Sequence, residues 1–282
     1  MSVRQLATQA VRTAARLRAD CRVGAADALC PYDLAEQLDL AVRLVPLPSM
    51  EGMYAPFPKP TILVSAERPP GRRRYTCAHE IGHHVFGHGT RLDELTDDTV
   101  QTWNPEEFLA HRFAAGLLMP KLAVESAFAR RGLSLSDPRP QDVFLVAQNL
   151  GVGHTTLVGH LERTLGCLSS ARADILRRTS LPRLRSRLAG FAVDHDLVVF
   201  DEHWGCRPID IEVGDIVLVP QSARFEGICA VLENHPLRHL RAAMPGVGTV
   251  AINTPPPIAV RVSQRNFSGL ARYRNLEDPD GR

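Results

Sequence analysis

The run His79-Glu80-Ile81-Gly82-His83 is an HExxH motif and the most chemically informative segment of the chain. An α-helix turns about 100° per residue, so His79 and His83 project from one face, one turn apart, and can share one ion. Two imidazoles suit zinc. Glu80 lies at the edge of that face, where its carboxylate can reach a water on the metal. The motif therefore predicts a Zn²⁺ cofactor, with Glu80 as the general base of a hydrolase.

A third metal ligand is expected downstream, because catalytic zinc usually takes three protein ligands and leaves the fourth position to water. Glu107 stands 24 residues after His83 and opens an amphipathic helix that can pack on the HExxH helix. The connection over residues 93–102 is short enough for the two helices to lie antiparallel, which brings Glu107 over the histidines. Glu106 is the alternative ligand, since neighbouring helical positions point about 100° apart.

The elements expected around the motif form a mainly helical unit with a small sheet. Apolar spacing and capping residues predict helices over 1–20, 31–38, 72–87, 105–119 and 121–131. Strand-like runs occur at 41–47, 52–54 and 61–65, and they predict a small antiparallel sheet. The loop 134–140 is dense in Ser, Pro and Asp and marks a boundary. We therefore expect an α+β chain whose zincin-like zinc peptidase domain covers residues 1–135.

Two further units are expected after this domain. Residues 141–165 have the spacing of two short helices joined through Gly151, which is typical of a helix-turn-helix. The segment 171–190 carries six arginines against one aspartate and indicates a linker or an exposed helix. From Phe191 onward the chain turns to short β-rich runs between Gly, Pro and Asn turns. The prediction is a helix-turn-helix-like helical unit with a basic linker over 136–188, followed by a β-rich C-terminal domain over 189–282.

Composition and cysteine usage favour a cytoplasmic protein without membrane association. With 44% hydrophobic and 23% charged residues the chain is ordinary for a globular protein, and no stretch approaches the roughly 20 apolar residues of a membrane span. The six cysteines include no CxxC pair, which favours reduced thiols and argues against cysteine-bound zinc. The first helix lacks the apolar core of a secretory signal. Its apolar residues fall on one side, which predicts packing on the domain: Leu6, Ala10, Ala14 and Leu17.

A DNA-binding transcriptional regulator with a structural zinc site is the alternative to an enzyme. The net charge of +2 gives no general case for nucleic acid, but the arginine-rich segment 171–190 follows the predicted helix-turn-helix. The candidate recognition helix from His154 has no Lys or Arg before Arg163, so phosphate contacts would fall to the later arginines. Direct DNA binding is therefore the less favoured interpretation.

The two motifs together resemble the ImmA/IrrE family of metallopeptidases. The resemblance rests on Arg-Arg-Arg-Tyr-Thr-Cys-Ala-His-Glu-Ile-Gly-His-His from Arg72, on Glu-Phe-Leu-Ala-His-Arg-Phe-Ala-Ala-Gly-Leu-Leu-Met-Pro from Glu107, and on the strand region 52–64. Residues 30–120 thus look like the peptidase core of the family. The resemblance implies a zinc metalloendopeptidase of the gluzincin type. It maps the zinc ligands and the base onto His79, His83, Glu107 and Glu80.

The same resemblance implies a proteolytic switch. Family members cleave a helix-turn-helix transcriptional repressor, in radiation response or in mobile-element induction, so such a repressor is the implied substrate and partner. A helix-turn-helix-like unit after the core is also implied, in agreement with residues 141–165. Some members carry a sensor-like domain in the terminal region, so a regulatory role of 189–282 is a hypothesis.

Several residues near the motif keep open roles. The family often has Asn at the position of His111, which lies one turn after Glu107, so His111 is either an additional ligand or a neighbour of the ligands. The donor for a developing oxyanion is open among His84, His88, His111 and Tyr75. As a pair at the helix end, His84 and His88 are expected to be solvated or capping residues and not a second metal site.

Overall fold

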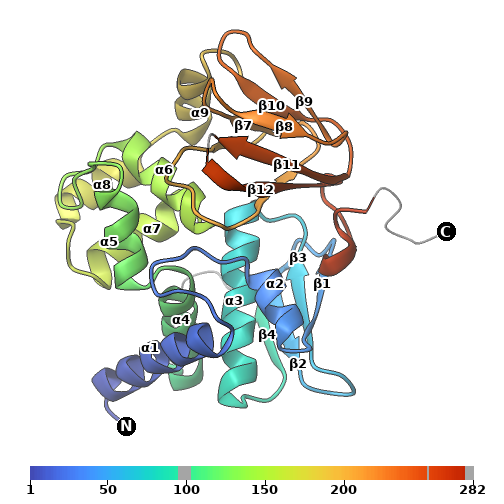
Figure 1. Ribbon diagram of the computed structural model, residues 1–282. Helices are drawn as coiled ribbons and strands as arrows, with labels where there is room; N and C mark the ends of the chain where they lie inside the picture. Colours follow the sequence, from blue (N-terminus) through green and yellow to red (C-terminus); the bar gives the residue numbers. More distant parts are fainter. Residues whose placement is uncertain (95–102, 253, 277–282) are drawn as a thin grey trace. The chain divides into compact units, whose positions relative to one another are not determined.

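The computed structural model describes residues 1–94, 103–252 and 254–276 and is α+β (Figure 1). The chain forms two compact units. The first comprises residues 1–124, 150–153 and 268–272, and the second comprises 125–149, 154–267 and the chain from 273. The three-part division expected from the sequence stays a prediction. Among the described residues, none of the helices has the length and apolar character that a membrane span requires.

The helices of the first unit begin and end close to the predicted signals. They are α1 (Val3–Asp20), α2 (Pro31–Gln37), α3 (Pro70–Phe86) and α4 (Pro105–Leu118), and α5 (Lys121–Ala129) follows at the unit boundary. Asn104 caps α4 by accepting hydrogen bonds from the backbone N–H groups of Glu106 and Glu107. Gly87 ends α3 in the left-handed conformation at φ +68°, which glycine adopts without steric cost. The helix that carries HExxH thus has a defined end.

A five-stranded mixed sheet accompanies α3 in the first unit (Figure 1). Its strands are β1 (Ala41–Val45), β2 (Met50–Ala55), β3 (Thr61–Ser65), β4 (Arg91–Glu94) and β13 (Gly269–Leu270), in the order β13-β1-β3-β2-β4. β2 pairs antiparallel with β3 and β4, but β1 pairs parallel with β3, so the prediction of an antiparallel sheet was wrong. Two chain reversals separate β1 from β3 and leave them running the same way. They lie side by side because β3 is inserted between β1 and β2.

Arg18, and not Leu17, completes the buried side of α1. The apolar residues of this side are buried as expected: Leu6, Ala10 and Ala14. Arg18 continues their four-residue spacing and is only 2% exposed. Its guanidinium donates hydrogen bonds to the backbone carbonyls of Leu117, Gly24 and Asp27. These charge-assisted bonds offset the cost of burying the charge, and they tie α1 to the end of α4.

The second unit begins with helices. They are α6 (Pro140–Leu150), α7 (His154–Arg163), α8 (Ser170–Arg177) and α9 (Leu181–Ala189). The turn between α6 and α7 contains Gly151 at φ +75°, where the sequence predicts it. The basic segment forms the helices α8 and α9, and each of them buries apolar residues: Ala173, Leu176, Leu184 and Ala189.

The rest of the second unit is β-rich, as expected from Phe191 onward. One sheet has the order β5-β7-β10-β9 and the other β6-β12-β11-β8. The strands are β5 (Leu197–Val199), β6 (Ile209–Glu212), β7 (Ile216–Leu218), β8 (Arg224–Glu226), β9 (Ala230–Glu233), β10 (His239–Ala242), β11 (Gly246–Ile252) and β12 (Thr254–Ser263). Their inward side chains form one apolar core together with Trp204 from the loop before β6, and its strand members include Ile209, Val217, Leu240, Val250 and Val260.

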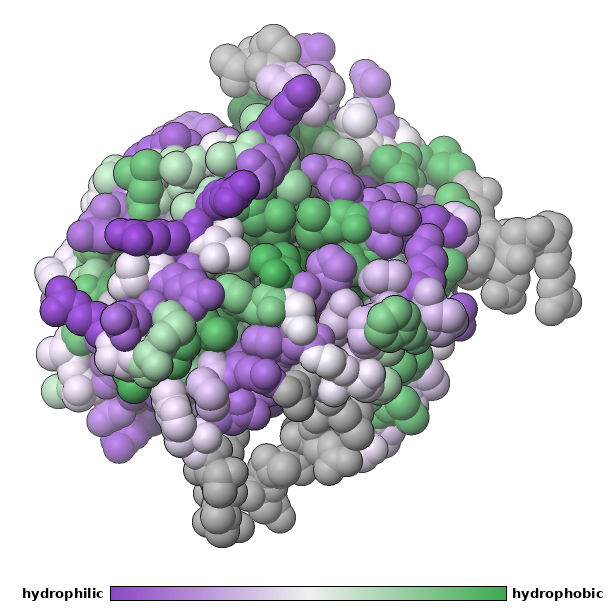
Figure 2. All heavy atoms as spheres, turned by 90° about the horizontal axis from the view of Figure 1, so that it is seen from below, coloured by the Kyte–Doolittle hydropathy of each residue, from purple (hydrophilic) through white to green (hydrophobic). Residues whose placement is uncertain are grey.

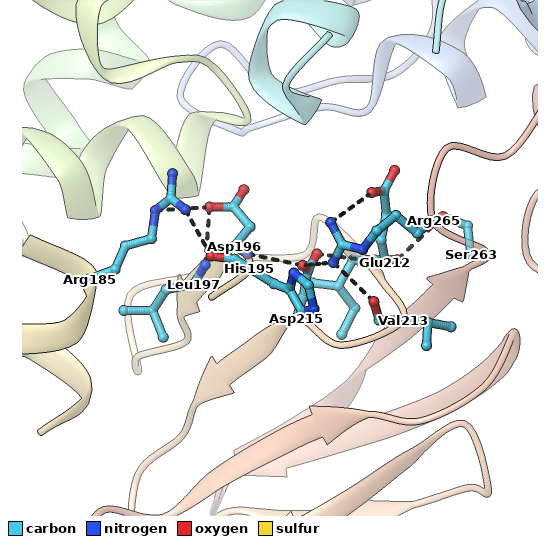
Figure 3. Close-up of polar contacts among 10 residues, drawn as sticks. Arg185, His195, Asp196, Leu197, Glu212, Val213, Asp215, Ser263 and Arg265 are labelled. Carbon is cyan, nitrogen blue, oxygen red and sulfur yellow. Dashed lines mark hydrogen bonds and ion pairs between the residues drawn. The ribbon is translucent and has the colours of Figure 1, made fainter. Parts of the chain in front are cut away.

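A buried carboxylate holds the turn between β6 and β7 (Figure 3). Asp215 accepts hydrogen bonds from the backbone N–H groups of Asp196 and Glu212 at 3.0 and 2.8 Å, and from the Arg265 guanidinium at 3.0 Å. The same guanidinium donates to the carbonyl of Val213. A buried carboxylate with these donors is satisfied. The cluster therefore supports the fold of the β-rich region.

The surface of the molecule mixes polar and apolar residues. On the face shown in Figure 2, hydrophobic residues gather near the middle and hydrophilic residues lie around and among them. Large exposed apolar side chains occur in both units: Phe57, Trp103, Ile228 and Val247. Such exposure is ordinary for globular proteins.

His154 is expected to give the fold a pH-dependent stability. Its ring is 5% exposed, and burial lowers its pKa to about 4, a shift that a hydrogen bond to the Pro140 carbonyl partly opposes. Within the described part of the chain its Nε2 has no hydrogen-bond partner. Between about pH 6.5 and pH 4, His154 is therefore protonated in the unfolded chain but neutral in the folded chain. The free energy of unfolding decreases as the pH is lowered through this window.

Replacing His154 with Asn tests this effect. The Asn amide can keep a donor for Pro140 but does not titrate. When the pH is lowered from 7 to 5, the free energy of unfolding should therefore decrease by about 2 kcal/mol less in the variant than in the unmodified chain. Urea unfolding at both pH values measures this difference. His203→Asn is the control, because His203 is only partly buried, and it should keep the original pH dependence. Equal pH dependence in the His154 variant would contradict the assignment.

Candidate metal centre

Two helices build the site, and small residues let them come close. Gly82 on α3 faces α4, where a Cβ added to it would lie 3.1 Å from the Cα of Ala110 and 3.1 Å from the ring of Phe113. Any larger side chain would push the helices apart. α3 carries His79 and His83, and the first turn of α4 carries Glu107.

The three predicted ligands converge on one point. The Nε2 atoms of His79 and His83 are 3.0 Å apart. The two carboxylate oxygens of Glu107 lie 3.2 Å from Nε2 of His79 and 3.5 Å from Nε2 of His83. A tetrahedral ion with bonds of about 2.1 Å holds its ligand atoms roughly 3.4 Å apart. The spacing of these residues therefore fits a metal ion, and it brings together all three residues that the sequence selected.

The burial and the charge of these three residues also suit the binding of a metal ion. Both histidines are buried, whereas the Glu107 side chain is 30% exposed, so the site is open on the α4 side. Hydrogen bonds to His79 and His83 hold the pKa of the Glu107 carboxyl far below its usual range. A carboxylate must be ionised to bind a metal. These ion pairs are made by Glu107, so the geometry favours it over Glu106.

His111 belongs to a second, overlapping set of donors. His79, Glu107 and His111 offer ligand atoms within 4.8 Å of one another, and the rings of His79 and His111 are 4.3 Å apart. We favour His83 as the third ligand, because it is fully buried and its Nε2 is within 3.0 Å of His79, whereas His111 is exposed. The Tyr75 hydroxyl donates to the backbone carbonyl of His111 at 3.2 Å. His111 thus lies at the exposed rim.

Glu80 is fully buried and is bordered by the backbone of β2. A Cβ added to Gly52 would lie 2.6 Å from Oε1 of Glu80 and 2.4 Å from the methyl group of Thr76. Glycine is therefore the residue that leaves the Glu80 carboxylate in place. The sequence shows Gly52 within a strand, but it carries no signal of this contact, because the two residues meet only when β2 packs on α3.

The two remaining histidines of the motif region take different places. The hydroxyl of Tyr54 and Nδ1 of His84 are 2.9 Å apart, and Nδ1 of His88 lies 2.9 Å from Nδ1 of His83. His88 is 9% exposed, so it is not a solvated residue, but its backbone N–H caps the end of α3 by donating to the carbonyl of His83. The reason is the left-handed turn at Gly87, which folds the chain back along the end of α3.

Comparison with known proteins adds one match. Residues 35–157 match the family model described as Peptidase_M78, IrrE N-terminal-like domain. The match runs from α2 into α7 and covers every residue of the site described above. No curated protein matches the chain.

Proposed function

Because residues 35–157 place the chain in the ImmA/IrrE family of metallopeptidases, we propose that it is a zinc-dependent endopeptidase of the gluzincin type. The observation that carries the proposal is the convergence of His79, His83 and Glu107 from two helices, at distances that suit one tetrahedral ion. Glu80 follows His79 in the chain, is fully buried, and lies against Gly52 of β2. These observations support the proposal of a zincin-like site, in which three residues bind the metal and Glu80 is the base.

Zinc is the proposed metal because two imidazoles and one carboxylate are a ligand set of catalytic zinc sites. When bound, zinc supplies a Lewis acid that polarises the peptide carbonyl and lowers the pKa of a water. Glu80 then acts as the general base: a carboxylate oxygen takes a proton from the attacking water and delivers it to the nitrogen of the leaving amine.

His111 is the proposed donor to the developing oxyanion. It is exposed at the open side of the site and its ring lies 4.3 Å from the ring of His79. The Tyr75 hydroxyl donates to the backbone carbonyl of His111. The rings of His84 and His88 are within hydrogen-bond distance of Tyr54 and His83. Of the four residues left open by the sequence, we therefore propose His111 as the donor of a hydrogen bond to a peptide substrate.

The proposed substrate is a helix-turn-helix transcriptional repressor, whose cleavage would switch on stress or mobile-element genes. This step rests on the family resemblance of the two motifs. The six cysteines are present as thiols, which supports a reducing, cytoplasmic setting. The residues of α6 and α7 are the proposed helix-turn-helix-like unit of the chain itself.

Direct DNA binding is less well supported. α7, the candidate recognition helix, buries most of its length, including His154, Leu157, Val158, His160 and Leu161. Three arginines of the basic segment already pair with carboxylates: Arg172 with Asp137, Arg177 with Glu162 and Asp174, and Arg185 with Asp196. A recognition helix needs an exposed face for the groove, and phosphate contacts need available cations.

Incubation with the helix-turn-helix repressor encoded beside the gene tests the proposal. The zinc-loaded protein should cut this repressor into two fragments, a chelator should stop the reaction, and added Zn²⁺ should restore it. An unrelated helical protein serves as the control and should stay intact. An uncut repressor, together with a DNA mobility shift by the chain itself at low salt, would overturn the enzyme in favour of the regulator.

A further inference from the structure

We propose that His88 is a positioning residue for the metal ligand His83, and that the turn at Gly87 places it there. The inference rests on the proposed zinc site and adds to it the residue that orients one ligand. Sequence spacing does not indicate this role, since His88 lies beyond the end of α3.

Each ring nitrogen of His83 lies close to a different neighbouring group. Its Nε2 faces His79 and Glu107, and its Nδ1 lies 2.9 Å from Nδ1 of His88 in the buried interior. A histidine that binds a metal through Nε2 carries its proton on Nδ1. That proton has an acceptor in Nδ1 of His88. The bond therefore selects the metal-binding tautomer of His83 and fixes the orientation of its ring.

The backbone turn after α3 brings the two rings together. The Gly87 N–H donates to the carbonyl of His84 at 3.1 Å, and the His88 N–H donates to the carbonyl of His83 at 3.0 Å. This pair of bonds is a Schellman turn, which requires the left-handed conformation that Gly87 adopts at φ +68°. A Cβ at Gly87 would meet nothing within 4 Å, so glycine serves the backbone conformation and not the space. His88 contacts His83 through both backbone and ring.

Aromatic packing keeps the His88 ring in place. The Phe86 ring stacks on it, with ring centroids 5.7 Å apart and planes at 22°. Phe86 in turn contacts the Phe113 ring of α4 edge-on at 5.8 Å. His88 is thus held between an aromatic side chain and the ligand it orients. Such packing limits the rotamers of His88 and preorganises the bond to His83.

His84 offers a matched comparison on the same helix end. It also uses Nδ1, with Tyr54 as its partner at 2.9 Å, but Tyr54 belongs to β2 and is not a ligand. Removing His84 therefore deletes a bond of the same length at the same helix end, without touching the ligand His83.

Three substitutions test the role through metal affinity. His88→Leu removes the acceptor, and His88→Asn places an amide oxygen near the position of Nδ1. Competition of each purified protein with a chelating dye for Zn²⁺ should show affinity about 10- to 100-fold lower for the leucine variant. The asparagine variant and the control His84→Leu should stay within about threefold of the unmodified protein. The visible absorption of bound Co²⁺ should change only in the leucine variant, and the zinc-free proteins should melt alike.

Two outcomes would overturn the inference: unchanged Zn²⁺ affinity in His88→Leu, or an asparagine variant as weak as the leucine one. If the leucine variant does not fold, Gly87→Ala strains only the turn, and it should lower Zn²⁺ affinity in the same direction. Unchanged affinity there would count equally against the role. Failure of the unmodified protein to bind Zn²⁺ would instead overturn the proposed function.

Discussion

Glu80→Gln is expected to lower the rate of repressor cleavage about a thousandfold while the protein keeps its zinc. The amide has the shape of the carboxylate but cannot take a proton from water. Glu80 is fully buried and an amide of the same size fits in its place, so the replacement should leave the positions of His79 and His83 unchanged. Single-turnover cleavage of the repressor and metal analysis of the purified variant measure the two quantities separately.

The cleavage rate and the zinc content of Glu80→Gln together test whether Glu80 is the base or a metal ligand. Cleavage at the original rate would show that Glu80 is not the base. Loss of zinc together with activity would show that Glu80 helps to bind the metal. Glu106→Gln is the control, because Glu106 is an acidic residue near the site but outside the proposed ligand set, and it should keep both zinc and activity.

Glu107→Gln is expected to lower zinc affinity by more than about 100-fold, since it removes a charged ligand where even a residue behind a ligand affects affinity 10- to 100-fold. The carboxylate of Glu107 contacts both histidines and is held ionised by them. An amide carries no charge to offset that of the ion. Equilibrium competition with a chelating dye measures the loss, and Glu106→Gln should show none.

His111→Ala decides between the two overlapping donor sets. If His83 is the third ligand, the His111 variant keeps zinc and loses only part of its cleavage rate. Loss of zinc equal to that of Glu107→Gln would show that His79, Glu107 and His111 hold the metal instead. Unchanged zinc affinity in Glu107→Gln, with loss in Glu106→Gln, would exchange the roles of the two glutamates.

The sequence by itself determined where most helices lie and which residues are the candidate metal ligands. HExxH places two imidazoles on one helical face whatever surrounds them, because the helical repeat is local. Asn104, Pro105 and the following glutamates mark the start of α4, and the structure begins α4 at Pro105. Caps, periodicity and short-range spacing depend on neighbours within a few residues, so they are readable without the fold.

Only the tertiary structure decided what surrounds these residues. β1 pairs parallel with β3, and β13 from near the chain end joins the same sheet. Gly52 borders Glu80, and His88 turns back onto His83. These contacts depend on strand order and on how side chains pack once the segments are folded together, which local patterns do not encode. The candidate ligands follow from spacing along the chain, whereas the residues that contact them follow from the fold.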